Sequence, residues 1–508
     1  MEKNYYITTP IYYVNDKPHI GHAYTSIACD VIARFKRLDG YNVKFLTGTD
    51  EHGQKVEKAA LSQNKTPIEY ADFISKDFRS LTEILNLSND DFIRTTEKRH
   101  KIASENLWKK LYENNHIYLG KYSGWYALKD EAFYSEKEIT NGKAPSGAEV
   151  TWVEEESYFF DLSKWQNKLL DFYNKNPDFI DPKSRMNEVK SFVQSGLRDL
   201  SVSRTSFAWG VKVPESKNHI MYVWLDALTN YLSAVGYPDL ENKEYLNFWP
   251  ADLHMVGKDI LRFHAVYWPA FLMAADLPLP KRIYAHGWWT NEGKKISKSE
   301  GNVIDPIEMI NSYGLDQIRY FLLREVPFGS DGDFSKNALH SRINGDLSND
   351  LGNLSQRVIS MIYKNCDGRI PKMPSTLNNQ DNIFCDKSIK LFTNVKKEID
   401  KQCFHEALKS IWKFISEANK YVDEQAPWKL KNENRSRMED VLWILSDNIR
   451  KIAIMTLAFM PISSNKILDQ LSVDTKERNF VYLNPEFHIQ SNSIDSPKPI
   501  FPRIDTKT

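Results

Sequence analysis

The spacing of apolar residues in the first fifty positions switches between the period of a strand and that of a helix. Residues 5–14, YYITTPIYYV, are rich in β-branched and aromatic side chains and predict a strand. Apolar residues then recur at helical spacing from Ile20 to Leu38, and residues 40–53 predict a turn, a second strand and a loop. A strand, a helix and a strand in this order predict a βαβ unit and therefore a parallel sheet.

The pattern changes twice further along the chain. Residues 115–210 crowd aromatic, glycine and acidic residues into short strand-like pieces around an amphipathic stretch at 163–176, which predicts an inserted subdomain. Strand and helix signals alternate again from 219 to 290, so we expect the sheet to be completed there. Strand signals then fade, and amphipathic stripes predict helices of a C-terminal bundle at 347–365, 404–424 and 437–460.

These patterns predict an α/β fold in which a parallel-sheet domain is split by an insertion and followed by an all-α helical bundle. The predicted segments are residues 1–114, 115–213, 214–335 and 336–508.

Composition narrows the class of protein. The 508 residues include 67 Lys and Arg and 67 Asp and Glu, and this balance argues against a protein that coats nucleic acid non-specifically, although it permits a local basic surface for one folded RNA. The four cysteines lie far apart, which excludes metal-knuckle spacing and fits a reducing cytosol. No secretory signal is visible, and the longest apolar run, 452–462, is too short to cross a bilayer. We therefore expect a cytoplasmic protein without a membrane partner.

Two histidines flank a glycine in PHIGHAY, where the first strand gives way to a helix. His19 and His22 are three residues apart, so both rings share one helical face, and Gly21 lets a phosphate or a flat ring approach. The free N–H groups and positive dipole end of a first helical turn favour phosphate. Alone, this spacing is weak, and a structural histidine pair is the competing interpretation.

A second segment, NEGKKISKSEGN at 291–302, clusters lysines and serines between two glycines. The lysines can oppose the charge of a triphosphate, the hydroxyls can hydrogen-bond it, and Gly293 and Gly301 can act as hinges. The competing interpretation is a solvated lysine loop.

Together, HIGH at 19–22 and KISKS at 295–299 resemble the HIGH and KMSKS signatures of class I aminoacyl-tRNA synthetases, with Ile296 in place of methionine. The segments FLTGTDEHG, SGLRDLSVSR, FAWGVKVP, YVWLDALTNY and VGKDILRFHAVYWPAFL are similar to the methionyl-tRNA synthetase family, and the likeness continues into the helical tail with DLGNLSQR and APWKL.

The resemblance implies a Rossmann-like catalytic domain and an anticodon-binding bundle. It implies that the protein activates L-methionine with Mg²⁺-bound ATP, releases pyrophosphate, and transfers methionine to the 3′-terminal adenosine of tRNA(Met) for initiation and elongation. Positioning and charge stabilisation suffice for this chemistry, so the absence of a nucleophilic triad is expected.

Site residues carry over by their positions in the matching motifs. Catalytic roles fall to His19, His22, Lys295 and Lys298. ATP binding adds Gly21, Gly257, Asp259 and Ser297. Asp50 matches the carboxylate that receives the methionine ammonium, and the side-chain site matches Ile11, Tyr13, Trp224, Ala227, Leu228, Tyr231, Ile260 and His264. Such a lining suits a soft thioether, to which the Tyr13 hydroxyl can donate, although aromatic clusters of this kind are more often plain core.

Anticodon recognition matches Asn353, Arg357 and Trp428. Without the resemblance, the first two suit a surface pair and the third a core aromatic residue.

The chain also departs from the family pattern. Residues 124–150 contain no cysteine where many relatives bind zinc, so we expect a zinc-free insertion held by packing of Trp125, Tyr126, Phe133 and Tyr134. The insertion is too short for the editing domain of the isoleucine, valine and leucine enzymes. We expect a monomer, because an appended dimer-forming module has no room.

Three alternatives stay open at this point. A sister enzyme specific for leucine or cysteine would share the motifs. A small-molecule nucleotidyltransferase also uses H-x-G-H, although the helical tail argues against it. An inactive RNA-binding homologue is disfavoured by the presence of both phosphate motifs.

Overall fold

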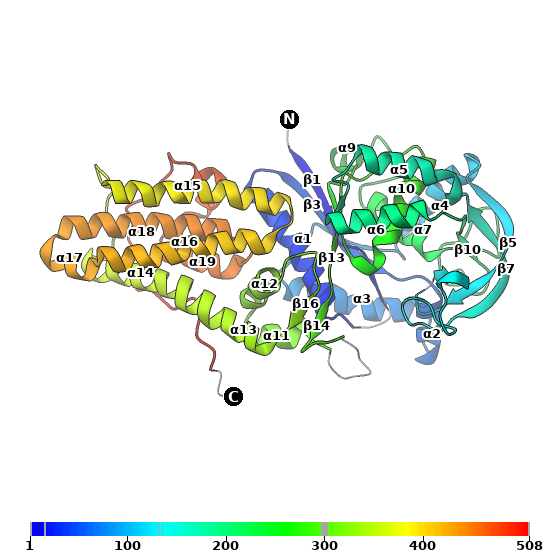
Figure 1. Ribbon diagram of the computed structural model, residues 1–508, viewed down its shortest axis with the longest axis horizontal. Helices are drawn as coiled ribbons and strands as arrows, with labels where there is room; N and C mark the ends of the chain where they lie inside the picture. The colour runs from blue at the N-terminus through cyan, green and yellow to red at the C-terminus, as the bar shows by residue number, and fades with distance from the viewer. Residues whose placement is uncertain (1–2, 15–16, 131, 135, 296–302, 506–508) are drawn as a thin grey trace. The chain divides into compact units, whose positions relative to one another are not determined.

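The computed structural model describes residues 3–14, 17–130, 132–134, 136–295 and 303–505, and its packing separates them into two units. One unit combines the first three residues and His19–Asn42 with Gly287–Thr508, and the other combines Asn4–Pro18 with Val43–His286. This division cuts across the predicted segment borders at 115, 214 and 336, which therefore stay predictions. The α/β fold with a helical C-terminal part is confirmed (Figure 1).

A seven-stranded sheet forms the centre of the second unit. Its order is β2 (Tyr12–Tyr13), β3 (Asn42–Asp50), β1 (Asn4–Thr8), β12 (Leu253–Gly257), β13 (Ile283–His286) and β8 (Ile180–Asp181), with β4 (Asp91–Arg94) also paired to β3. The strand predicted at 5–14 is broken at Thr9–Ile11, because Pro10 has no N–H for a sheet ladder. The pairings β1–β12, β12–β13, β13–β8, β2–β3 and β3–β4 are parallel, as predicted.

Helices of the same unit bury their apolar faces in a core that runs along the sheet. Two others, α2 (Gln54–Ser62) and α3 (Pro67–Ile84), pack in a separate cluster that contains Val56 and Phe78. The helices of the main core are α4 (Lys98–Glu113), α7 (Val223–Leu228), α8 (Asn230–Ser233), α9 (Lys243–Phe248) and α10 (Trp268–Ala274). Trp108 of α4 and Trp268 of α10 are both fully buried in this core.

The predicted insertion is built on a separate antiparallel sheet. The long hairpin of β5 (Ile117–Ala127) and β7 (Thr151–Phe160) is extended by β6 (Ala132–Tyr134) and β9 (Leu200–Ser201), with α5 (Gln166–Lys175) and α6 (Lys183–Gln194) between β7 and β9 (Figure 1). A short ribbon of β10 (Ser203–Arg204) and β11 (Ile220–Met221) leads back toward α7. The amphipathic stretch predicted at 163–176 corresponds to α5.

The first unit joins α1 (Ile20–Leu38) to the C-terminal helices. The bounds predicted for α1 are confirmed. A three-stranded sheet of β15 (Lys294–Lys295), β14 (Trp289–Asn291) and β16 (Gly332–Phe334) precedes the bundle. Helices α11 (Pro306–Tyr313) and α12 (Leu315–Arg324) lie between β15 and β16 in sequence. The helices after β16 are α13 (Lys336–Ser341), α14 (Asn353–Asn365), α15 (Asn379–Asp400), α16 (Phe404–Gln425), α17 (Pro427–Glu433), α18 (Arg435–Thr456) and α19 (Pro461–Gln470).

Four of these helices, α14, α15, α16 and α18, run side by side as a bundle (Figure 1). The three helices predicted from apolar stripes are found as α14, α16 and α18, with α14 entered through a π-helical stretch at Arg342–Gly352. Helix α15 was not predicted, because its buried positions are diluted by lysines and aspartates. In the described residues, no helix combines the length and the apolar character needed to cross a bilayer.

Ion pairs fasten α1 to the C-terminal helices within the first unit. Asp30 and Arg319 of α12 are both fully buried, and Arg319 Nη2 lies 2.6 Å from Asp30 Oδ2. Arg319 also donates to the carbonyl oxygens of Ala458 and Phe459. At the far end of α1, Asp39 pairs with Lys396 of α15 at 2.7 Å. Because a buried carboxylate is costly without a partner, these contacts hold α1 in one position.

Replacing Arg319 by Met should lower the free energy of unfolding by about 3–5 kcal/mol. The change removes the fully buried partner of Asp30, which keeps its pair with the partly exposed Arg34, and it removes the donor to two buried carbonyl groups. The shift in the midpoint of urea unfolding measures this loss. Lys387→Met removes an exposed pair with Glu417 and should give a much smaller shift. Equal shifts in the two variants would contradict the role given to Arg319.

Candidate active site

The first turn of α1 is capped by two imidazoles that hold each other. His19 is the N-cap residue, and its Nδ1 accepts a hydrogen bond from the Gly21 N–H at 3.1 Å. His22 Nδ1 accepts in turn from the His19 N–H at 3.1 Å, which completes a reciprocal capping box. Because both Nδ1 lone pairs are used as acceptors, the ring proton of each neutral histidine resides on Nε2. The motif therefore supplies two Nε2–H donors at a helix N-terminus.

Glycine at position 21 makes room for this cap. A Cβ there would lie 2.9 Å from His19 Cε1, so any side chain would displace the His19 ring. The sequence argument assigned this space to a ligand, whereas the structure gives it to His19. The two rings lie 3.9 Å apart between centroids. Burial lowers the pKa of the His22 imidazole well below its usual value, and the neighbouring His19 adds to the shift, so His22 is a neutral donor at neutral pH.

The lysine-rich motif lies largely outside the described residues. Lys295 ends β15 and pairs with Thr290 of β14, but its side chain is not described, and Ser297 and Lys298 fall in the segment 296–302. The chain is described again from residue 303, and the Ile20 N–H of α1 donates to the Ile304 carbonyl oxygen at 3.3 Å. The chain just beyond the motif therefore meets the first turn of α1 within the same unit.

In the second unit, the ends of three adjacent parallel strands bring together residues that are far apart in sequence. Asp50 is the last residue of β3, Ile11 follows β1, and Gly257 is the last residue of β12. Parallel strands all end at the same edge of their sheet, and ligands of open α/β sheets bind at that edge. Tyr13 joins this group because it pairs in register with Asp50.

The turn after β12 places a carboxylate beside a glycine. A Cβ at Gly257 would lie 2.5 Å from Asp259 Oδ1, so a side chain at this position would displace the carboxylate. The two predicted ATP-binding residues of this turn are therefore linked, because the Asp259 carboxylate can take this position only beside a residue without a side chain.

Next to this turn, a hydrogen-bonded chain fixes the histidine of the predicted methionine site. His264 Nδ1 lies 3.0 Å from the Ile260 carbonyl oxygen, which can only accept, so Nδ1 carries the proton. His264 Nε2 then accepts from the Tyr231 hydroxyl at 2.8 Å. Burial lowers the pKa of His264 to about 4, which keeps the imidazole neutral. The histidine sits in a π-helical turn, Phe263–Tyr267, a form often found at functional sites.

Aromatic and aliphatic side chains surround this pair. The Trp224 ring stacks on Phe263 with centroids 3.7 Å apart, and the Tyr231 ring stacks on His254 at 4.1 Å. The partly buried predicted residues pack against the core that contains Leu228 and Tyr231, and they are Ile11, Tyr13, Trp224 and Ile260. Ala227 is buried in α7 beside Leu228. The predicted set thus lies on elements that pack together, and Phe263 and His254 are additions that the sequence argument missed.

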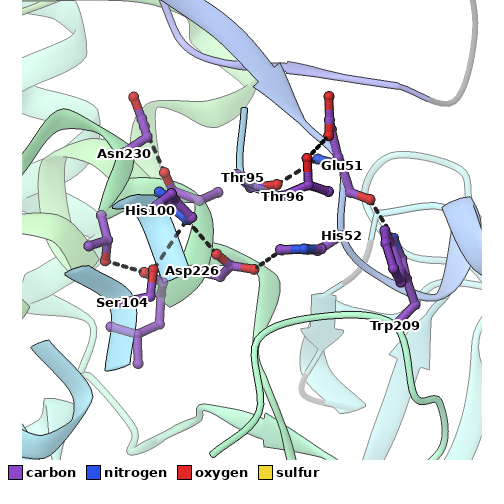
Figure 2. A network of polar contacts seen from close by, with 12 residues as sticks. Glu51, His52, Thr95, Thr96, His100, Ser104, Trp209, Asp226 and Asn230 are labelled. Atoms are coloured by element: carbon purple, nitrogen blue, oxygen red, sulfur yellow. Dashed lines mark hydrogen bonds and ion pairs between the residues drawn. The ribbon is translucent and has the colours of Figure 1, made fainter. Parts of the chain in front are cut away.

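The sequence argument also missed a buried polar network behind these residues (Figure 2). Asp226 of α7 lies 2.6 Å from His52 Nδ1 and 2.7 Å from His100 Nε2 of α4. The signal was present in VWLDAL, where a carboxylate interrupts an apolar helix, but its partners lie 126 or more residues away.

In the bundle, two of the three predicted anticodon residues contact each other. The Arg357 guanidinium lies over the Trp428 ring, 5.4 Å from its centroid, and Arg357 also pairs with Asp423 at 2.7 Å. Trp428 remains 42% exposed, and Asn353 is exposed one turn before Arg357 on α14. A half-exposed aromatic ring beside an arginine can stack on an unpaired base.

Comparison with known proteins places the chain in a family. A model of class I tRNA synthetases (M) matches residues 5–150 and 138–359. The chain is 58% identical to methionine–tRNA ligase of Rickettsia bellii, with 99% of this chain and 100% of the relative covered, and 51% identical to that of Brucella suis over 99% and 98%. The solved structure of Mycobacterium tuberculosis methionyl-tRNA synthetase in complex with methionyl-adenylate matches with a TM-score of 0.96 and 48% identity, covering 99% of this chain and 100% of that one. The chain belongs to the methionine–tRNA ligase family.

The inserted segment of this synthetase offers no fit for zinc. Residues 124–150 contain no cysteine, and within the described ranges no three His, Cys, Asp or Glu side chains gather as a metal site. Asp130 instead accepts hydrogen bonds from the hydroxyl groups of Tyr134, at 2.8 Å, and Ser146. Hydroxyl groups held by one carboxylate cannot replace the thiolates of a tetrahedral site.

Aromatic packing accompanies this polar contact. Trp125 meets Trp152 edge to face with centroids 5.3 Å apart, and the Tyr126 ring lies 5.7 Å from the Arg204 guanidinium carbon. Tyr134 packs on a small cluster of Ala127, Ala144 and Ala148. The side chain of Phe133, also predicted to pack here, lies outside the described residues.

The depressed pKa of His264 predicts a pH-dependent contribution to stability. The unfolded chain binds a proton near pH 6.5 and the folded synthetase only near pH 4, so stability falls as the pH drops through this window, by about 3 kcal/mol in total. In His264→Asn, this loss should disappear. The stability deficit of the variant, measured by urea unfolding, should be largest at pH 7 and shrink steadily toward pH 4. A deficit that is constant with pH would contradict a neutral, buried His264.

Proposed function

We propose that the synthetase joins L-methionine to ATP, releasing pyrophosphate, and then transfers methionine from the adenylate to the 3′-terminal adenosine of tRNA(Met) for initiation and elongation. The observation that carries this proposal is the similarity over the full chain to methionine–tRNA ligases, at 58% identity for the Rickettsia bellii enzyme. The 48% identical Mycobacterium tuberculosis enzyme was solved with methionyl-adenylate, the intermediate of this reaction.

The two capped histidines are proposed to act on the triphosphate. Their neutral Nε2–H groups would donate hydrogen bonds to phosphate oxygens, and the N-terminus of α1 would add its own N–H groups. Because the donors are fixed before ATP binds, they can stabilise charge that develops during transfer without reorganisation. The lysines would supply the positive charge, and Mg²⁺ would enter with ATP. The full proposed ATP set is His19, Gly21, His22, Gly257, Asp259, Lys295, Ser297 and Lys298.

Methionine is proposed to bind at the carboxyl ends of β1 and β3. Asp50 would receive the α-ammonium group, since burying an ammonium requires a charged or polar partner. The thioether would lie among Ile11, Tyr13, Trp224, Ala227, Leu228, Tyr231, Ile260 and His264. Neutral His264 supports this role, because an imidazolium beside the apolar side chain would disfavour its burial.

In the second step, the 2′-hydroxyl group of the terminal ribose would attack the methionyl carbonyl carbon and AMP would leave. The residues proposed to bind the anticodon are Asn353, Arg357 and Trp428.

We also propose that the enzyme acts in the cytoplasm as a zinc-free monomer. Its four free cysteines support a reducing compartment, and a single chain supplies every residue of the proposed sites.

The function is tested by ATP–pyrophosphate exchange with each of the twenty amino acids, in the wild type and in His22→Asn. Methionine should drive the wild-type reaction best. Asn keeps an acceptor at the position of Nδ1, so the α1 cap survives, but it lacks the Nε2–H donor. Exchange by the variant should therefore fall by about 10²–10³-fold.

A matched control is His340→Asn, the same change in α13 of the same unit, which should leave exchange unaltered. Circular dichroism should show unchanged helix content in both variants. Exchange driven best by leucine or cysteine would move the assignment to a sister enzyme, and undiminished exchange in His22→Asn would remove His22 from the site.

Trp428→Ala should separate the two steps. Loss of a stacking surface for one base should lower kcat/KM for tRNA(Met) charging about tenfold or more, while tRNA-independent exchange stays unchanged. Tyr363→Ala is the matched control, because Tyr363 of α14 is also 42% exposed in the bundle. Equal loss of exchange and charging would show that Trp428 is structural.

A further inference from the structure

A buried carboxylate in α7 is held by two histidines from other parts of the second unit. Asp226 is 1% exposed, and Figure 2 shows it between His52, which follows β3, and His100 of α4. Its two oxygens are used separately, with Oδ2 2.6 Å from His52 Nδ1 and Oδ1 2.7 Å from His100 Nε2. Burial by itself raises the pKa of a carboxyl group, but the two imidazoles outweigh it, and the pKa of Asp226 lies well below its usual value. Asp226 is therefore an ionised acceptor, and both histidines are donors.

A neighbouring hydroxyl group holds the other side of the His100 ring. Ser233 Oγ donates to the Thr229 carbonyl oxygen at 2.9 Å and lies 3.1 Å from His100 Nδ1. His100 Nε2 lies 2.7 Å from Asp226 Oδ1 and 3.2 Å from Ser104 Oγ. The ring is therefore fixed through both of its nitrogens, which holds its contact to Asp226 in one direction.

The same contacts tie the Asp50 loop to the helix of the predicted thioether site. His52 is two residues after Asp50, while Asp226 lies between Trp224 and Leu228. The loop is held again at Glu51. Its side chain accepts from Arg94 at 2.7 Å. Its carbonyl oxygen accepts from Trp209 Nε1 at 2.6 Å (Figure 2). A shift of either partner of the His52–Asp226 contact would leave a buried charge without its donor, so the separation of the loop from α7 is strongly restrained.

We propose that Asp226, with His52 and His100, is a positioning residue that sets the distance between the ammonium-binding Asp50 and the side-chain site on α7. It thereby controls methionine binding without touching the substrate. This inference rests on the proposed function, because it assumes that Asp50 and Trp224 hold two ends of one methionine. The cluster lies in buried surroundings, so its effect is transmitted through geometry and not through solvent-exposed charge.

Asp226→Asn tests the proposal by a split in kinetic constants. The amide oxygen can accept from one imidazole, but the amide N–H₂ group faces the N–H donor of the other, so one of the two ties is lost. In ATP–pyrophosphate exchange, the KM for methionine should rise about tenfold or more, while the KM for ATP changes by less than about twofold. A merely structural carboxylate would lower the amount of active enzyme and leave both KM values unchanged.

The matched control is Asp161→Asn. Asp161 is 2% exposed and accepts from His116 Nδ1 at 3.1 Å, so the chemical change is the same. It lies at the base of the β5–β7 hairpin, where it also contacts Lys164 and Trp165, and none of these residues belongs to the predicted methionine set. Both variants should lose thermal stability. Only Asp226→Asn should alter the KM for methionine.

A second pair of variants tests the link without removing the buried charge. His52→Ala removes the donor and should raise the KM for methionine, whereas His52→Asn places an amide N–H near the position of Nδ1 and should restore it to within about twofold of the wild-type value. Unchanged methionine KM values in Asp226→Asn and His52→Ala, or equal changes in the KM for ATP, would overturn the proposal. Absence of methionine-dependent exchange in the wild type would overturn the proposed function instead, so the two failures are distinguishable.

Discussion

The parallel pairing of β3, β1 and β12 is the constraint on which the rest of the second unit depends. Parallel neighbours cannot be joined by tight hairpins, so long segments must separate them in sequence. Their carboxyl ends nevertheless meet at one edge, and this places Asp50, Ile11 and the Gly257–Asp259 turn beside one another although more than two hundred residues separate the first from the last. β1 lies between β3 and β12 in the sheet, although it is followed in sequence by β2 and α1.

Buried charges further restrict the positions of the helices in each unit. Asp30 in the first unit and Asp226 in the second are each almost fully excluded from solvent, and each is matched by donors from elements remote in sequence. Apolar side chains of similar volume would serve stability as well or better, because the attraction within a buried pair barely repays desolvation. The charged groups instead make displacement of a helix costly. A helix packed by leucines alone can slide or rotate at small cost in free energy, whereas movement of α1 or α7 would leave a buried carboxylate without a hydrogen-bond donor.

Local features of this fold could be predicted from the sequence, whereas most of its long-range contacts could not. Helix α1 was predicted to the residue because its apolar period is unbroken, and His19 and His22 were found because their spacing is a local pattern. Helix α15 was missed because Lys and Asp residues lie among its buried Phe384, Leu391 and Val395. The His52–Asp226–His100 cluster was missed for a different reason. His52 and Asp226 stand in FLTGTDEHG and YVWLDALTNY, and His100 lies in neither segment. A pattern along the chain does not state which helix packs behind which loop.

Burial has the largest influence on two of the histidines in the proposed sites. The pKa of His22 is lowered by burial and by His19. The pKa of His264 is lowered by burial although the Ile260 carbonyl oxygen and the Asp259 carboxylate act in the opposite direction. Both imidazoles are therefore neutral at neutral pH. The two neutral histidines therefore add hydrogen-bonding groups of fixed direction to the proposed substrate sites without adding charge. An anionic triphosphate would meet its positive partners chiefly in the lysines proposed to bind it, Lys295 and Lys298, while His19 and His22 would contribute hydrogen bonds.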